Sequence, residues 1–266
     1  MIDLYSDTQS RPTEAMREAM VGAEVGDEQS GTDPTTIRLE ETVATMLGKE
    51  AAVFLPTGTM CNLVAVALHT SPGDVIVVDS MGHILRSETG GAGVVSGVLT
   101  DPVDGHRGHF TADQVTDRLD RTSRYRPPTS LICLEQTHNF AGGTVWPLEK
   151  WDEVCDVAVE RAIAVHVDGA RLLNAVVASG VAAERWAARV DTVWIDFSKG
   201  LGAPMGACLA GSKEVIDIAW LWKHRLGGAM RQSGIMAAAA LYSLNHHVER
   251  LVDDHERASR LAEALA

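Results

Sequence analysis

The stretch AIAVHVDGAR (162–171) carries the pattern that decides the fold. Its small and β-branched residues predict a buried strand over 162–168, and the glycine after Asp168 permits a turn. Similar short runs alternate with longer helical patterns along the whole chain. This alternation is typical of an α/β protein in which helices cover a mostly parallel sheet.

Seven strands are predicted in this way, at 51–55, 75–79, 93–99, 130–135, 162–168, 192–196 and 206–211. Helices are expected after Asp33, which precedes Pro34 as an N-cap, after Pro147, and over the apolar stretch 235–244. A helical stripe then continues to the last residue. We therefore expect a large domain over 1–245 and a helix, 246–266, leading into a small domain that is missing here.

Composition excludes several classes of partner. The 266 residues include 23 Lys and Arg against 36 Asp and Glu, a net charge of −13, with no basic stripe. Binding to nucleic acid or to an acidic membrane is therefore not expected. No apolar run approaches the roughly 20 residues of a membrane helix, and Met1 does not open a secretory leader. The cytoplasm is the expected location.

The cysteines and paired histidines do not predict a metal site. Cys61, Cys133, Cys155 and Cys208 show no C-x-x-C spacing and lie in apolar surroundings, so buried free thiols are expected rather than disulfides or zinc ligands. The pairs in HRGH (106–109) and HH (246–247) are interpreted as solvated side chains, and no bound metal is predicted.

Three glycine-rich turns follow predicted strands, at the sheet edge where open α/β folds bind ligands. In LPTGTMCNL (55–63), Gly58 permits a tight turn and Thr59 opens a helix with a free hydroxyl and unpaired backbone N–H groups. This arrangement could hold a phosphate, although it is not a P-loop. Ordinary helix capping is the alternative interpretation.

Asp168 ends the strand at 162–168, and a carboxylate there is costly to bury without a cationic partner. It could pair with Arg171 three residues later. It could instead face the protonated ring nitrogen of a cofactor such as pyridoxal phosphate.

The third turn, DFSKGLGAP (196–204), places Lys199 31 residues beyond Asp168, on what should be the next strand. An acid and an amine would then share one edge. Small neighbours leave room for an aldehyde to form a Schiff base with the amine, although an isolated lysine in a loop is more often solvated.

The chain resembles the L-threonine aldolases of the β-eliminating lyase group, pyridoxal-phosphate enzymes with the aspartate-aminotransferase fold (fold type I). The matching segments, in family order, are IDLYSDTQSRP (2–12), GDEQSGTDPT (26–35), GKEAAVFLPTGTMCN (48–62), LEQTHN (134–139), HVDGARLLNA (166–175), SKGLGAPMG (198–206) and GGAMRQSG (227–234). The resemblance implies that Lys199 is the Schiff-base lysine and Asp168 the partner of the pyridine nitrogen. Gly58 and Thr59 would hold the phosphate.

Further roles follow only from the resemblance. His83 matches the histidine that lies against the cofactor ring, and we expect it to assist proton transfer. Arg171 and Ser6 match groups at the cofactor and the substrate carboxylate. Arg231 matches an arginine that reaches the phosphate or carboxylate across a subunit interface, so a homodimer or homotetramer is implied.

The sequence also departs from the family pattern. Ser30 replaces a tyrosine, Tyr5 replaces an arginine, and Gln136 stands where asparagine is common. The family continues into a small domain that supplies another carboxylate-binding arginine.

The implied activity is cleavage of L-threonine, L-allo-threonine or a related L-β-hydroxy-α-amino acid to glycine and an aldehyde. The alternatives are β-elimination to ammonia and a keto acid, or an inactive dimerising protein. The preferred substrate and the catalytic base stay open.

Overall fold

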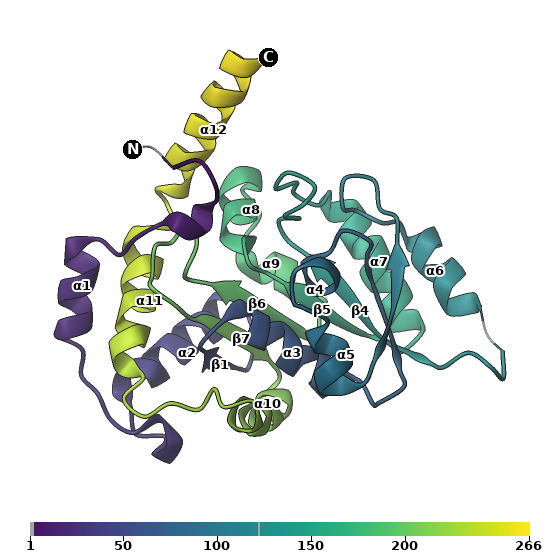
Figure 1. Cartoon of the computed structure of the whole chain (residues 1–266), viewed down its shortest axis with the longest axis horizontal. Coiled ribbons are helices and arrows are strands. Elements are labelled where there is room, and N and C mark those ends of the chain that lie inside the picture. The colour runs from purple at the N-terminus through teal and green to yellow at the C-terminus, as the bar shows by residue number, and fades with distance from the viewer. Residues whose placement is uncertain (1–2, 122) are drawn as a thin grey trace.

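A seven-stranded sheet forms the centre of the computed structural model, which describes residues 3–121 and 123–266 (Figure 1). The strand order is β1-β7-β6-β5-β4-β2-β3. β7 runs antiparallel to both of its neighbours, and the other pairs are parallel. The predicted mostly parallel, seven-stranded sheet is therefore confirmed.

Six of the predicted strands are present within two residues of their expected limits. The seven observed strands are β1 (Ala51–Leu55), β2 (Val75–Asp79), β3 (Leu99–Val103), β4 (Thr129–Glu135), β5 (Ala164–Asp168), β6 (Thr192–Asp196) and β7 (Ala207–Gly211), and β3 is the one that does not match.

The strand predicted at 93–99 is wrong. Residues Gly91–Ser96 form helix α5, bounded by Gly90 and Gly97 with φ values of 74° and 68°, and Val94 points into solvent. The edge strand β3 begins only at Leu99 and includes Pro102, which an edge strand tolerates because its outer side needs no ladder hydrogen bond.

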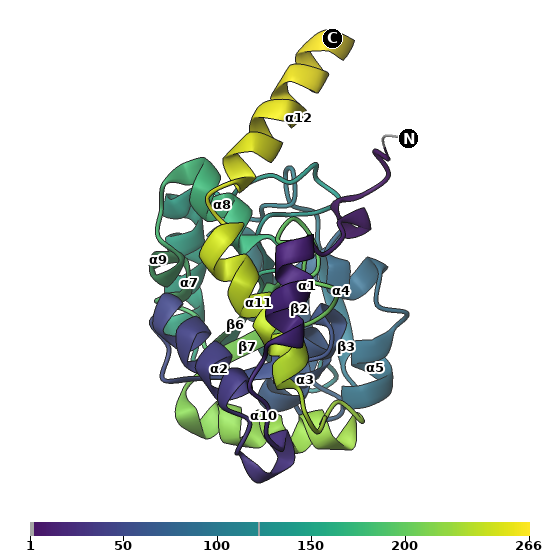
Figure 2. The ribbon, with the colours of Figure 1, turned by 90° about the vertical axis from the view of Figure 1, so that its left-hand side faces the viewer.

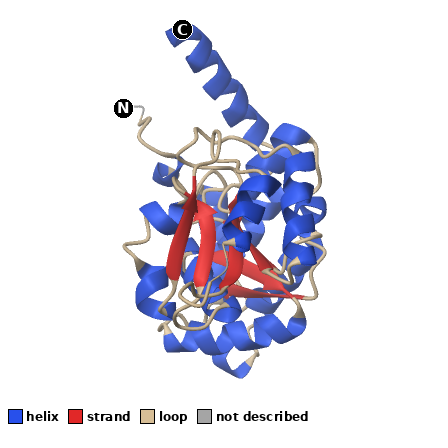
Figure 3. Cartoon of the chain, turned by 90° about the vertical axis from the view of Figure 1, so that its right-hand side faces the viewer, coloured by secondary structure: helices blue, strands red, loops and turns tan. Residues whose placement is uncertain are grey.

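Helices cover both faces of the sheet, giving three layers (Figures 1 and 3). One face carries α2 (Pro34–Met46), α7 (Leu148–Glu160), α8 (Leu172–Ser179), α9 (Ala183–Ala187) and α11 (Gly234–His246), and α1 (Glu14–Val21) packs on α11. The other carries α3 (Gly58–His69), α4 (His83–Arg86), α5 and α10 (Lys213–Arg225). α6 (Ala112–Asp120) lies beside α7. The predicted cap is present, since Asp33 accepts the N–H of Thr36.

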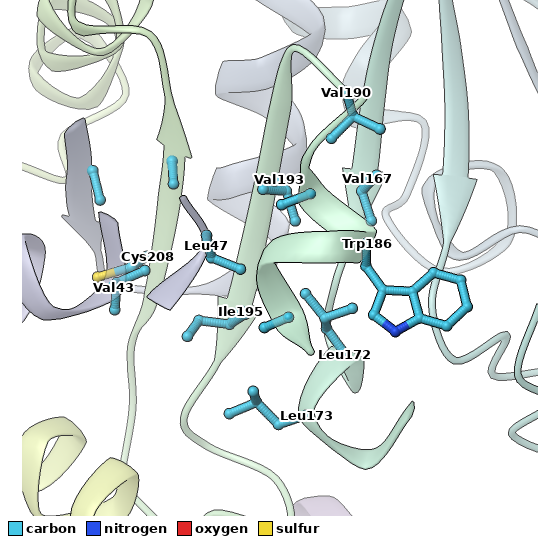
Figure 4. Close-up of a cluster of buried hydrophobic side chains, with 14 of the residues drawn as sticks. Val43, Leu47, Val167, Leu172, Leu173, Trp186, Val190, Val193, Ile195 and Cys208 are labelled. Atoms are coloured by element: carbon cyan, nitrogen blue, oxygen red, sulfur yellow. The ribbon is translucent and has the colours of Figure 1, made fainter. Parts of the chain in front are cut away.

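The larger hydrophobic core lies between the sheet and the first of these helix layers (Figure 4). Val167, Val193 and Ile195 of the central strands lie in one cluster with Leu172 and Trp186. Because side chains alternate along a strand, the residues next to Val167, Val193 and Ile195 in the same strands face the other way, toward α3. His166, Asp168 and Trp194 therefore lie on the α3 side of the sheet.

Helix α12 (Leu251–Leu265) projects away from the body of the molecule (Figures 1 and 2). Leu251 is its one buried residue, and Asn174 of α8 contacts His255 (Nδ2 to Nε2, 3.2 Å) near its base. The predicted division between 1–245 and 246–266 stays a prediction. In the described residues, no helix combines the length and the apolarity needed to cross a membrane.

Candidate functional site

Four parallel strands end in an acidic residue at the same edge of the sheet. These residues are Asp79 of β2, Glu135 of β4, Asp168 of β5 and Asp196 of β6, and all four are buried. The cost of burying charge requires a donor or cation for each carboxylate. The partners that meet this requirement define the candidate site.

Asp168, which is 1% exposed, receives its main hydrogen bond from α3. The Nδ2 of Asn62 donates to Oδ2 of Asp168 at 2.8 Å, and the backbone N–H of Ala170 donates to Oδ1 at 3.1 Å. The same Nδ2 donates to Oε1 of Glu88 at 2.6 Å. One buried amide therefore bridges two buried carboxylates.

The orientation of the Asn62 amide is fixed by its neighbours. Its oxygen lies 2.7 Å from Nε1 of Trp194, which can only donate a hydrogen bond. The Nε2 of His166 lies 3.0 Å from the same oxygen and donates to it as well. The Nδ2 group must therefore face Asp168 and Glu88, and Nδ1 of His166 is left to accept from Thr192 at 2.9 Å. Burial lowers the pKa of His166 to about 3, so this histidine stays neutral.

His83 begins α4 and stands at the same edge. Its Nδ1 lies 2.9 Å from Oε1 of Glu88, and its backbone N–H donates to Oε2 of Glu135 at 2.8 Å. The hydrogen bond with Glu88, supported by the charge of Asp168, raises the pKa of His83. Burial raises the pKa of Glu88, and burial together with Asp168 raises that of Glu135. The edge is thus crowded with acidic groups that favour a cation.

Lys199 lies three residues beyond the end of β6. This strand is the neighbour of β5, which ends in Asp168. Its Nζ is 2.5 Å from Oδ2 of Asp196, and it lies 5.6 Å from the ring centre of Trp194. The other oxygen of Asp196 accepts both the N–H and the hydroxyl of Ser198 at 2.7 Å. The structure therefore brings the predicted acid and amine to adjacent strand ends.

The N-terminus of α3 packs against the same tryptophan. A Cβ on Gly58 would lie 2.3 Å from the Trp194 ring, so only glycine fits this close approach. Thr57, rather than Thr59, is the N-cap and accepts the N–H of Met60 at 3.1 Å. Thr59 is exposed, and its hydroxyl bonds to no residue that the structure describes. It is left available to a ligand at the helix N-terminus.

An N-terminal arm crosses the edge of the site. Arg171 forms two hydrogen bonds with Asp7, at 2.6 and 2.7 Å. They outweigh the effect of burial and lower the pKa of Asp7. Ser6 caps the short turn that begins at Asp7, and the Ser10 hydroxyl donates to the backbone oxygen of Lys199 at 2.6 Å. Ser6 therefore precedes the residue that contacts Arg171, and the carboxylate partner of Arg171 in this structure is Asp7.

Arg231 is the predicted site residue that stays apart from this group. Its Nη1 lies 3.0 Å from Oδ2 of Asp27, and its side chain is 64% exposed. The family departures are also peripheral or structural. Tyr5 is exposed, Ser30 bonds to Asp27, and buried Gln136 accepts the N–H of Trp146 at 3.3 Å.

These residues suit pyridoxal phosphate chemically. The backbone N–H groups of Gly58 and Thr59 bond to no residue that the structure describes, so they could donate to a phosphate at the N-terminus of α3. Asp168 is a buried carboxylate that can meet a protonated ring nitrogen, and Lys199 supplies the amine. His83, Glu88 and Asp168 have ligand atoms within 4.8 Å of one another, a spacing that could hold a metal ion. However, Asn62 already donates to both carboxylates, which reduces their need for a cation.

Sequence reasoning missed Asn62, Glu88 and Asp196. Two signals were present. Asn62 is the polar residue inside the otherwise apolar run MCNLVAVAL, and such a residue needs buried partners. Asp196 is one of several acidic residues that end a predicted strand. Glu88 gave no comparable signal.

Comparisons with known proteins identify the family of the chain. The family described as beta-eliminating lyase matches residues 3–266. The low specificity L-threonine aldolase of Escherichia coli K12 is 44% identical over 266 residues, covering 100% of this chain and 79% of the relative. The low-specificity L-threonine aldolase 1 of Arabidopsis thaliana is 42% identical over 268 residues, covering 99% and 75%.

A solved structure of the threonine aldolase of Leishmania major superposes with a TM-score of 0.84 at 18% identity, covering 97% of this chain and 77% of that one. This likeness supports the fold, which is the large domain of the aspartate-aminotransferase-like (fold type I) enzymes. The family match and the two sequence relatives go further: the chain belongs to the beta-eliminating lyase family.

Proposed function

We propose that this chain is a pyridoxal-phosphate enzyme that cleaves L-threonine, L-allo-threonine or a related L-β-hydroxy-α-amino acid to glycine and an aldehyde. The observation that carries the proposal is that Asp168 ends β5 and Lys199 follows the end of the adjacent strand β6, beside the N-terminus of α3. The threonine aldolases among its sequence relatives support the same reaction.

Each group at the edge has a separate task in this proposal. The cofactor supplies an aldehyde that binds the substrate amine and a ring that takes up electrons from Cα. Lys199 would hold the aldehyde between turnovers, Asp168 would keep the ring nitrogen protonated, and Gly58 and Thr59 would bind the phosphate. Because Asn62 fixes the Asp168 carboxylate, that charge needs little reorganisation during the reaction.

The substrate would be held and deprotonated by other residues. Arg171 and Ser6 would bind its carboxylate, with Asp7 keeping the Arg171 guanidinium in place. His83 would take the proton of the β-hydroxyl group as the Cα–Cβ bond breaks. Fixing the direction of that bond is the main task of the carboxylate contacts.

A product assay tests the proposal directly. The purified protein, with pyridoxal phosphate, is incubated separately with L-threonine, L-allo-threonine and L-phenylserine. Glycine with acetaldehyde or benzaldehyde is expected. Ammonia with a keto acid would instead identify the β-elimination that the sequence left open, and no product from any substrate would contradict both reactions.

We also propose that the enzyme is a homo-oligomer acting in the cytoplasm. The exposed Arg231, held by Asp27, would enter the site of a neighbouring copy. All four cysteines are free and buried, which suits a reducing compartment. Cell fractionation tests the location, and a subunit-mixing experiment described below tests the interface.

A further inference from the structure

Glu88 lies at the candidate site, but none of the roles proposed above uses it. It stands in the turn between α4 and α5, and its side chain is 1% exposed. Its Oε1 meets two nitrogens, Nδ2 of Asn62 at 2.6 Å and Nδ1 of His83 at 2.9 Å. Its Oε2 has no hydrogen-bond partner among the described residues. A carboxylate buried in this way is costly, so its position calls for an explanation.

The direction of both hydrogen bonds can be deduced. Trp194 and His166 engage the oxygen of Asn62, so Nδ2 must donate to Glu88. When Glu88 is ionised it has no proton to give, and Nδ1 of His83 then donates to it as well. In the neutral imidazole, Nε2 is then the nitrogen without a proton. This Nε2 forms no hydrogen bond with any residue that the structure describes.

We propose that Glu88 is a positioning residue: by accepting the Nδ1 proton of His83, it keeps Nε2 ready to take the proton of the substrate β-hydroxyl group. This inference rests on the proposed function. As the O–H bond breaks, the new N–H bond forms on Nε2, and the oxygen electron pair becomes the carbonyl π bond of the departing aldehyde. The electron pair of the broken Cα–Cβ bond stays with the glycine fragment, which later gains a proton.

Other charges near His83 act in the same direction but without touching its ring. Asp168 comes from β5, and Glu135 from β4 accepts the backbone N–H of His83. The cationic or titratable neighbours of this edge pair with carboxylates of their own, as His138 does with Asp79, Lys199 with Asp196 and Arg171 with Asp7. Glu88 is therefore the acidic group placed to control the ring itself.

The first test needs no bound cofactor. Protein labelled with ¹⁵N-histidine is freed of cofactor, and the His83 resonances, assigned with a His83→Asn variant, are followed by NMR as pH changes. In the wild type we expect the Nδ1–H tautomer and a midpoint above the ordinary value of about 6.5. Glu88→Gln should lower the midpoint by about one unit. The matched control, Glu135→Gln, removes a charge that contacts His83 only through its backbone N–H and should lower the midpoint less.

The second test uses the enzyme with cofactor. In Glu88→Gln, kcat should fall about threefold to tenfold with KM changed less than threefold, because a base weaker by about one pKa unit serves the same bound substrate. The acidic limb of the kcat profile should move to lower pH, in step with the NMR midpoint. Glu88→Asp, which keeps the charge but shortens the reach, should show an intermediate kcat and serves if the glutamine variant does not fold.

The outcomes separate this inference from the proposed function. A wild-type protein without aldolase activity would contradict the proposed function whatever the NMR shows. An active wild type whose His83 midpoint and kcat profile are unmoved by Glu88→Gln would overturn the role of Glu88. A shift in Glu135→Gln as large as that in Glu88→Gln would do the same, since general electrostatics would then suffice.

Discussion

Trp194 donates its indole N–H to the amide oxygen of Asn62 at 2.7 Å, and this bond sets the direction of the hydrogen bonds that Asn62 makes with Asp168 and Glu88. A side chain from β6 thereby orients a side chain from α3, which in turn orients carboxylates on β5 and beside α5. The arrangement is rigid because each partner is buried and has few alternatives.

Asn62→Leu should destabilise the protein strongly. The change leaves the N–H groups of Trp194 and His166 without an acceptor and leaves two carboxylates without their shared donor. We expect the free energy of unfolding to fall by about 3 kcal/mol or more, measured by urea denaturation at fixed protein concentration. The control is Asn174→Leu, because Asn174 is half-buried and its side chain forms one hydrogen bond, with His255. This variant should lose less than about 1 kcal/mol. Equal losses in the two variants would argue against the Asn62 network.

Lys199→Ala should abolish covalent attachment of the cofactor. Borohydride treatment of the wild type, followed by peptide mass mapping, should find the cofactor reduced onto Lys199, because this amine stands at the acid-lined edge. The exposed Lys213→Ala should be labelled like the wild type. Attachment that persists in Lys199→Ala at a different lysine would show that the amine has been assigned wrongly.

Asp168→Asn should retain cofactor but lose most turnover. An amide of the same shape can still meet Asn62, but it cannot stabilise a positive ring nitrogen as a carboxylate does. We expect kcat to fall about a hundredfold, which corresponds to about 3 kcal/mol of transition-state stabilisation. Steady-state kinetics at saturating cofactor measures this, and near-normal turnover would remove Asp168 from the mechanism.

Mixing two inactive variants should restore activity if Arg231 acts across an interface. Lys199→Ala and Arg231→Ala are each expected to be poorly active. A hybrid dimer formed by co-expression has one site with an intact Lys199 from one subunit and an intact Arg231 from the other. Activity should therefore return to roughly half that of the wild type per isolated hybrid dimer. Hybrids as inactive as the parents would indicate that Arg231 serves its own chain or no site.

The buried His166 should make stability depend on pH. Burial lowers its pKa to about 3 in the folded state, whereas the unfolded chain has the ordinary value of about 6.5. The unfolded state then binds more protons, so stability is full above pH 6.5 and is lost as pH falls toward 3. Between pH 7.5 and 5.0 this histidine alone should remove about 2 kcal/mol.

Urea denaturation at these two pH values tests the effect. His166→Gln lowers stability at both, but the difference between them should shrink by about 2 kcal/mol. The exposed His224→Gln should keep the difference seen in the wild type. If His166→Gln also keeps it, the buried imidazole is not the source.

Local pattern was sufficient for most of the fold. The limits of β1, β2 and β6 were predicted to the residue because each is a short apolar run with a clear end. The interpretation failed at 93–99, where two valines follow a glycine. There the positive φ angles of Gly90 and Gly97 allow a short helix, and β3 contains a proline that pattern rules exclude from most strands.

For the site, sequence was informative where chemistry lies at the ends of neighbouring strands. Asp168 and Lys199 could be paired in advance because β5 and β6 are adjacent in the chain and in the sheet. The contacts of Asn62 could not, since they join residues 26, 106 and 132 positions apart. Such contacts depend on how α3 packs over the sheet, which no short-range pattern specifies.

The buried carboxylates at this edge of the sheet lower the stability of the fold while serving the activity. Burial and the charge of Asp168 raise the pKa of the Glu88 and Glu135 carboxyl groups, so keeping all three ionised together is costly. A sequence selected for stability alone would replace at least one with a neutral residue of similar shape. Their negative charge is matched once a cationic ring lies among them. Binding of the cofactor should therefore raise the stability of the folded enzyme, and the same cofactor makes the site reactive.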